Sequence, residues 1–216
     1  MNSLEDQKIA GRLEALHLAA SGDEQRWNVR REASKDSPPS TAPDPLIRMG
    51  EFYIPVSPDE GRLLYLLARS KNAQHIVEFG ASFGISTLYL AAAARDTGGK
   101  VTTTEVHPDK CESLRSSFSS AGVEQEVTLL EGDALETLQT LDKPVDFLFL
   151  DGWKSLYLPV FQLLKPLLSR HALIAADNVK FTETAPYLDH VRSSNSGLIT
   201  QIIDDMALSC VIGELT

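Results

Sequence analysis

From residue 75 onward, short apolar runs alternate with stretches of helical periodicity, and this alternation constrains the fold more than any other feature. The apolar runs predict five strands, at residues 76–79, 101–106, 127–130, 145–150 and 172–176. The stretches between them predict helices at 86–95, 108–121, 134–141 and 156–168. Apolar strands separated by helices are typical of a parallel sheet that is buried on both faces. We therefore predict an α/β fold with a doubly wound, mostly parallel sheet.

The two ends of the chain depart from this alternation. Apolar runs at 198–203 and 206–212, joined by two aspartates, predict a C-terminal antiparallel hairpin at the sheet edge. Residues 3–20 are apolar near helical spacing and predict a helix, whereas 34–45 hold four prolines and predict a linker or surface loop. We therefore divide the chain into an N-terminal helical extension with a proline-rich linker, residues 1–45, and an α/β domain, residues 46–216.

A helix start is encoded just before the first strand. Ser57 can cap this helix, Pro58 suits its first position, and Glu60 completes a capping box. The leucines that follow, at 63, 64, 66 and 67, predict its buried stripe.

Composition narrows the range of partners and locations. The formal charge of -10 disfavours nucleic acid as the main partner, and no apolar run approaches the ~18 residues of a membrane span. The first residues lack the apolar core of a signal peptide. Cys111 and Cys210 are the only cysteines and belong to no metal-binding motif. We predict a cytoplasmic protein that has no membrane or nucleic-acid partner.

The residues after the first three strands predict a nucleoside site, because ligands of such sheets lie beyond the carboxyl ends of the strands. Gly80 and Gly84 allow the backbone to approach a ligand closely, and Glu105 can accept the hydroxyls of a ribose. Asp133 and Ala134, after Gly132, offer a place for an adenine edge. The spacing is neither GxGxxG nor a phosphate-binding P-loop, which favours a nucleoside without a pyrophosphate. Alternatively, the glycines simply end a strand and Glu105 is a solvated acid.

The same glycine segment also matches G-x-S-x-G, the nucleophile elbow of serine hydrolases, with Ser82 as nucleophile and His190 downstream. That elbow normally follows several strands, whereas here it follows the first. No HGGG-like oxyanion loop precedes it. We therefore disfavour a serine hydrolase.

Polar residues after the fourth and fifth strands predict a metal centre. Asp151 follows one strand, and Asp177 and Asn178 follow the other. Neighbouring parallel strands lie about 4.8 Å apart, so these oxygen ligands can converge, and hard oxygens favour Mg²⁺ over zinc. Lys154 beside such an ion can serve as a general base. The alternatives are that both aspartates cap helices and that Lys154 is a surface charge.

Trp153 and Tyr157, from the same stretch, leave two interpretations open. Either could pack in the core or form a wall for a flat substrate.

Three segments carry a resemblance to a known family. Residues 149–159 (FLDGWKSLYLP), 175–179 (AADNV) and 77–86 (VEFGASFGIS) resemble the catechol O-methyltransferase family of class I S-adenosylmethionine-dependent O-methyltransferases, and the similarity runs from about residue 51 to 213. The resemblance implies a Rossmann-like methyltransferase domain over residues 46–216 that uses S-adenosylmethionine and a divalent metal, Mg²⁺.

The resemblance also implies roles for individual residues. Asp151, Asp177 and Asn178 match the metal ligands, Lys154 the general base, and Glu105 the ribose-binding acid. Further residues match positions that contact the cofactor, mostly around its methionine portion: Val56, Glu78, Gly80, Ser82, Ser86 and Asp151.

Five positions depart from the family pattern. Ser82 replaces an aromatic residue, and Gly152 stands in place of a histidine near the adenine. Phe52 and Thr182 replace a tryptophan and a proline that gate the substrate. Leu198 falls where the family has the acid that holds the second catechol hydroxyl. These departures leave the identity of the aromatic substrate open.

Taken together, these features predict a metal-dependent enzyme that moves a methyl group from S-adenosylmethionine to a hydroxyl of a small, vicinal-dihydroxy aromatic. One rival is a metal-independent methyltransferase of the same fold that acts on a carboxylate or an amine. Another is a protein that binds S-adenosylmethionine without transferring its methyl group. Residues 1–45 match no known pattern and suggest a lid or a homodimer contact.

Overall fold

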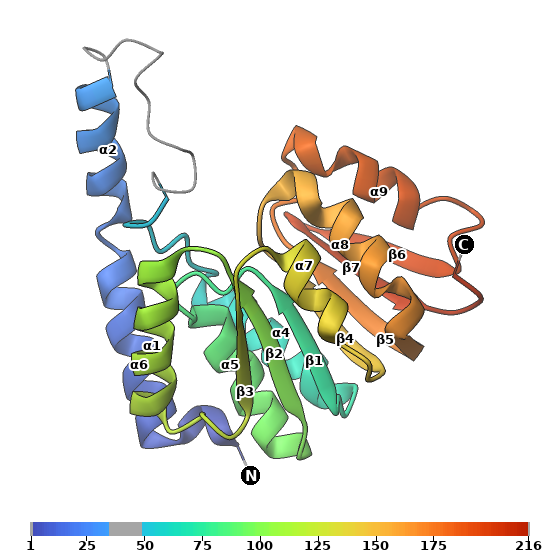
Figure 1. Ribbon diagram of the computed structural model, residues 1–216, viewed down its shortest axis with the longest axis horizontal. Helices are drawn as coiled ribbons and strands as arrows, with labels where there is room; N and C mark the ends of the chain where they lie inside the picture. The colour runs from blue at the N-terminus through green and yellow to red at the C-terminus, as the bar shows by residue number, and fades with distance from the viewer. Residues whose placement is uncertain (1, 35–48, 216) are drawn as a thin grey trace.

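A computed structural model describes residues 2–34 and 49–215 and confirms the predicted doubly wound sheet (Figure 1). The sheet has seven strands in the order β3-β2-β1-β4-β5-β7-β6. Strands β1 to β5 run parallel, and β7 pairs antiparallel with β5 and with β6, as expected for a C-terminal hairpin. The strand bounds are β1 His75–Phe79, β2 Lys100–Glu105, β3 Val127–Glu131, β4 Val145–Leu150, β5 Leu168–Ala176, β6 Leu198–Ile203 and β7 Met206–Val211.

Two helical layers cover the two faces of the sheet. Successive residues of one strand point into opposite layers: Ile76 joins one apolar cluster and Val77 the other, and Phe147 and Leu148 of β4 do the same. One layer holds α1 (Gln7–Ala20), α4 (Pro58–Ser70), α5 (Ile85–Thr97) and α6 (Pro108–Ala121). The other holds α7 (Ala134–Thr137), α8 (Tyr157–Leu164) and α9 (Ala185–Val191).

The predicted N-terminal helix packs onto the first of these layers. A short 3-10 turn, Ser3–Glu5, precedes α1, and α1 lies beside α6 (Figure 1). Ile9, Leu13 and Leu16 of α1 are buried in the same apolar cluster as α5. Helix α2 (Asp23–Ser34) follows and was not predicted. The predicted linker falls almost entirely on residues 35–48, outside the described part of the chain, and the division at residue 45 stays a prediction.

The capping box of α4 forms as predicted, with Ser57 N–H donating to Glu60 (2.6 Å) and Glu60 N–H donating to the Ser57 hydroxyl (3.3 Å).

One helix boundary differs from the prediction because of a proline. The helix predicted over 156–168 instead ends at Leu164, because Pro166 cannot continue it, and a 3-10 turn, Lys165–Leu167, leads into β5. Strand β5 therefore begins at Leu168 rather than at residue 172.

The helix predicted over 134–141 is also shorter. Helix α7 ends at Thr137 and continues as the 3-10 turn Leu138–Thr140. Within the described residues, no helix combines the length and the apolar character needed to cross a bilayer.

Candidate active site

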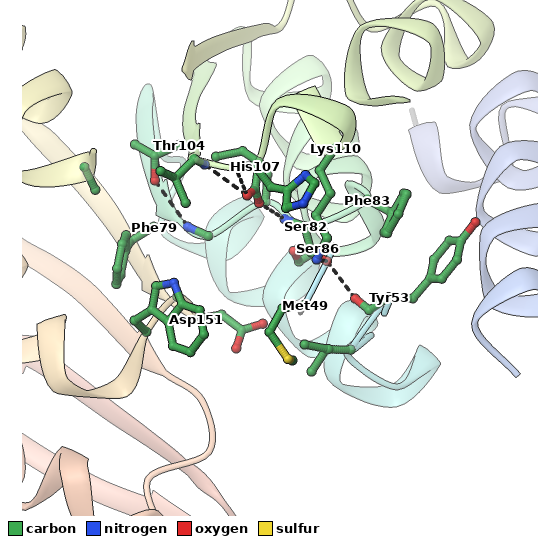
Figure 2. A pocket seen from close by; sticks show the side chains of 18 of the residues that line it. Met49, Tyr53, Phe79, Ser82, Phe83, Ser86, Thr104, His107, Lys110 and Asp151 are labelled. Atoms are coloured by element: carbon green, nitrogen blue, oxygen red, sulfur yellow. Dashed lines mark hydrogen bonds between the residues drawn. The ribbon is translucent and has the colours of Figure 1, made fainter. Parts of the chain in front are cut away.

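A cavity of about 590 Å³ opens beyond the carboxyl ends of the central strands (Figure 2). Ten of the twelve residues singled out from the sequence line it: Val56, Gly80, Ser82, Ser86, Glu105, Asp133, Ala134, Asp151, Lys154 and Asn178. The other two, Glu78 and Asp177, lie beneath its surface and are almost fully buried. The cavity thus brings the predicted cofactor, metal and base residues to one place.

The turn after β1 can be built only with glycine at its first position. Gly80 has φ = 97°, and a Cβ atom there would lie 2.6 Å from the Cα of Gly152, at the end of β4. The close approach of these two strand ends forms the floor of the cavity. Gly84, with φ = 88°, then caps the N-terminus of α5.

Glu105, the predicted ribose acid, is held in place by backbone N–H groups. Its Oε2 accepts from Ser82 (2.8 Å), and its Oε1 accepts from Val106 and His107 (2.9 Å each) (Figure 2). These bonds fix the carboxylate at the cavity wall. Asp133 caps α7 through a bond from the N–H of Leu135 (2.8 Å), so this acid serves as a helix cap as well as lining the cavity.

Glu78 lies under the glycine turn rather than on the cavity surface. Burial raises the pKa of its carboxyl, and hydrogen bonding by Ser86, Thr103 and Thr87 works in the opposite direction. Its Oε2 accepts from the hydroxyls of Thr87 (2.5 Å) and Thr103 (2.6 Å). Its Oε1 lacks a well-formed partner among the described residues and is available to a further donor.

The two predicted metal-binding carboxylates stand at the tips of paired strands. Leu150 of β4 is in register with Ala176 of β5, so Asp151 and Asp177 follow at the same level. Burial raises the pKa of Asp151 to about 7, with Lys154 opposing the rise and Asp177 adding to it. Burial also raises the pKa of Asp177 to about 6. Their negative charge is therefore incompletely compensated, which suits a cation.

Lys154 is fixed against both strand tips. Its Nζ donates to Asp151 Oδ1 (3.0 Å) and to the Tyr157 hydroxyl (2.9 Å). That hydroxyl donates in turn to the backbone carbonyl of Asp177 (2.9 Å). Tyr157 is fully buried, so it belongs to the core and also orients the lysine. The lysine is only 18% exposed, which argues against a simple surface charge.

The donor set fits a hard divalent cation. It consists of two carboxylates and the amide of Asn178, a residue that lines the cavity with φ = 54°. Carboxylate and amide oxygens are the ligands that Mg²⁺ prefers. Nowhere in the described part of the chain, this site included, do three His, Cys, Asp or Glu side chains gather closely enough to hold a metal, so the third protein ligand here is the amide of Asn178.

Comparison with known proteins decides the family. The model of the O-methyltransferase family matches residues 46–206, about three quarters of the chain. The chain belongs to the O-methyltransferase family. This membership confirms the predicted resemblance and the predicted class, a class I S-adenosylmethionine-dependent O-methyltransferase of the catechol O-methyltransferase type.

Individual relatives agree. Catechol O-methyltransferase B from Danio rerio is 30% identical over 78% of this chain and 67% of its own length. The catechol O-methyltransferase of Mycobacterium tuberculosis is 38% identical over 58% of this chain and 57% of its own. The chain thus spans about two thirds or less of these relatives. The O-methyltransferase TomG from Streptomyces achromogenes, solved in complex with SAM, aligns with a TM-score of 0.69 and 26% identity over 93% of this chain and 90% of TomG.

This O-methyltransferase has a pocket lysine that the sequence did not reveal. Lys110 of α6 is buried, and its Nζ donates to the Ser82 hydroxyl (2.9 Å), which donates to the carbonyl of Tyr53 (2.8 Å) (Figure 2). Desolvation lowers the pKa of Lys110, while Glu105 and Asp23 act in the opposite direction. A lysine in the first turn of a helix has no sequence signal that separates it from a surface charge.

The hydroxyl of Ser82 is therefore not that of a hydrolase nucleophile. Among the described residues its hydrogen-bond partners are a lysine and a backbone carbonyl, and no histidine contacts it as a base. His190 lies on α9, where its ring packs against Phe161.

The substrate-gating positions of this O-methyltransferase also differ from expectation. Phe52 is fully buried beneath Trp27 of α2 and does not line the cavity, whereas Trp27 does. Phe181 lines the cavity next to Thr182, which does not. Leu198 packs against the core cluster on the far side of β5. Trp27 was missed because the sequence of α2 contains few apolar residues to mark it.

Proposed function

We propose that this O-methyltransferase transfers a methyl group from S-adenosylmethionine to a hydroxyl of a small, vicinal-dihydroxy aromatic, with Mg²⁺ as its divalent cation. One observation carries the proposal: Lys154 Nζ lies 3.0 Å from Asp151 Oδ1. Asp151 follows β4 at the same level at which Asp177 follows β5, and Lys154 and Asp151 line the same cavity as Gly80. The names of the curated relatives, catechol O-methyltransferases, support the acceptor class.

Residues around the glycine turn would hold S-adenosylmethionine, which supplies an electrophilic methyl group on its sulfonium. Glu105 would receive the ribose hydroxyls at the wall where its oxygens are already fixed. Gly80 and Ser86 would line the methionine portion, with Val56, Glu78 and Ser82, while Asp133 and Ala134 would border the adenine. Support comes from the cofactor-bound TomG structure, whose fold this chain shares.

Asp151, Asp177 and Asn178 would hold Mg²⁺, which lowers the pKa of a hydroxyl placed beside it. Lys154 would then take the hydroxyl proton on its Nζ. A nearby dication disfavours the charged ammonium, which favours the neutral form that a base requires. Asp151 and Tyr157 hold this Nζ in position. The side chains of Lys154 and Asp151 are only 18% and 13% exposed, which would limit the access of water to the reacting hydroxyl.

Methyl transfer to a panel of catechols and monohydric phenols, measured with a labelled methyl donor, tests the proposal. We expect transfer to catechols only, loss of activity in EDTA and recovery with Mg²⁺. The Lys154→Ala substitution should lower kcat by about a hundredfold or more while leaving the Kd of S-adenosylmethionine within about twofold.

Other outcomes identify the rivals. Full activity in EDTA, or in an Asp177→Ala variant, would favour a metal-independent methyltransferase that acts on a carboxylate or an amine. Tight binding of S-adenosylmethionine without turnover on any acceptor would favour a binding protein.

Both cysteines are free thiols, which supports the predicted cytoplasmic location.

A further inference from the structure

Four large apolar side chains are exposed where they line the cavity. They are Trp27 (38% exposed), Ile54 (46%), Trp153 (42%) and Phe181 (55%). Single exposed apolar residues are ordinary on a protein surface, but several around one opening mark a binding site. They come from four separate segments of the chain, and Lys154 and Asn178 line the same cavity.

Trp27 is held at this opening by a specific arrangement. Its indole stacks on the buried ring of Phe52, with centroids 4.0 Å apart and an interplanar angle of 26°. Four residues earlier, Asp23 Oδ2 accepts the N–H groups of Tyr53 and Ile54 (2.9 Å each). Helix α2 is thereby fastened to the segment that lines the cavity.

The stack on Phe52 covers one face of the indole, and Trp27 is still 38% exposed and lines the cavity. Phe52 is completely buried, so at this position Trp27, and not Phe52, presents an aromatic surface to the cavity. Helix α2 ends at Ser34, ahead of the family match, which begins at residue 46. Trp27 therefore lies outside the segment that the family model matches.

We propose that Trp27 determines acceptor specificity by packing against the apolar body of an extended ortho-dihydroxy aromatic, such as a fused bicyclic diol. The inference rests on the proposed function, which places the hydroxyl-bearing end near Lys154. The apolar rim then receives the part of the acceptor that extends from that ring. An uncharged aromatic body suits this rim, whereas a single catechol ring leaves much of it exposed to water.

Substitution of Trp27 tests the proposal through two acceptors of different length, catechol and 2,3-dihydroxynaphthalene. For Trp27→Ala we expect the KM of the naphthalene diol to rise about three- to tenfold, the range of one lost aromatic contact. The KM of catechol and that of S-adenosylmethionine should change less than twofold. Trp27→Phe, which keeps a flat ring, should restore most of the lost affinity.

Val29→Ala is the matched control, because Val29 lies on the same helix, is 65% exposed and does not line the cavity. Equal losses for both diols in Trp27→Ala, or equal losses in Val29→Ala, would overturn the proposal. Calorimetric titration of both diols into wild type and Trp27→Ala separates this inference from the proposed function. If no acceptor is methylated, the proposed function is wrong. If the Kd of the naphthalene diol is the same in Trp27→Ala as in wild type, Trp27 does not bind the acceptor, whatever the outcome for the proposed function.

Discussion

At the scale of single residues, the buried ammonium of Lys110 should lower the stability of the folded protein, and its bond to Ser82 in the proposed cofactor site can explain why it is there. The Lys110 ammonium is buried and donates to the Ser82 hydroxyl, with the Phe83 ring 5.2 Å away, and among the described residues Glu105 and Asp23 offset its desolvation only in part. Burying a charge without a close partner opposes folding. The bond to Ser82, however, fixes the turn whose N–H binds the predicted ribose acid, Glu105.

Replacing Lys110 by methionine should separate these two effects. The chain length is kept and the buried charge is lost, so we expect the Tm at pH 7 to rise by a few degrees. The Kd of S-adenosylhomocysteine should rise about tenfold, because the charged hydrogen bond that orders the turn is lost. Thermal melts and calorimetry measure both quantities, and Lys143→Met, at an exposed lysine, is the control.

The pH dependence of this gain has a definite sign. Because desolvation lowers the pKa of Lys110 in the folded protein, the folded state loses its proton at a lower pH than the unfolded chain. Below that pKa both states are charged and the folded state bears the full penalty. The difference in Tm between variant and wild type should therefore be largest near neutral pH and shrink as the pH rises. A difference that grows with pH would refute this explanation.

At the scale of secondary-structure elements, local signals decided which boundaries were predictable. The capping box of Ser57 and Glu60 made the start of α4 predictable from the sequence. The end of α8 was predicted too late, and Pro166 explains why the helix ends before it. Helix α2 was not predicted because its sequence, DEQRWNVRREAS, has too few apolar residues to form a stripe at helical spacing. Its position depends instead on polar contacts to residues about 30 positions away, which periodicity cannot reveal.

Asp23 should therefore hold α2 in place. Asp23→Ala leaves the N–H groups of Tyr53 and Ile54 without their acceptor, and we expect a loss of about 1–3 kcal/mol in the free energy of unfolding. Urea unfolding measures it. Asp59→Ala is a close control, because Asp59 pairs with Arg62 three residues on, as Asp23 pairs with Arg26, but is 91% exposed. Equal losses in both variants would show that Asp23 contributes only its ion pair.

At the scale of the whole molecule, the alternation of strands and helices predicted the sheet, and the rule that ligands bind beyond strand ends predicted where the cavity lies. Asp151, Asp177 and Glu105 follow directly from that rule. Lys110 and Trp27 did not, because they stand on helices whose placement depends on tertiary packing. Trp27 in particular lies on α2, which follows α1 in the chain, and α1 itself is placed by packing against α5 and α6.

The strand tips should also make the stability of the entire domain depend on Mg²⁺. Two buried carboxylates with raised pKa values oppose folding when they are ionised, and a cation bound only by the folded state offsets that cost by mass action. At about 100 times its Kd, Mg²⁺ should contribute about 2.7 kcal/mol, a rise of several degrees in Tm. Thermal melts in EDTA and in Mg²⁺ measure this without any acceptor. Asp177→Asn should lose the Mg²⁺ effect while melting in EDTA at or above the wild-type temperature, since it removes a buried charge. A Mg²⁺ response that persists in Asp177→Asn would place the cation elsewhere and would remove Asp177 from the proposed metal centre.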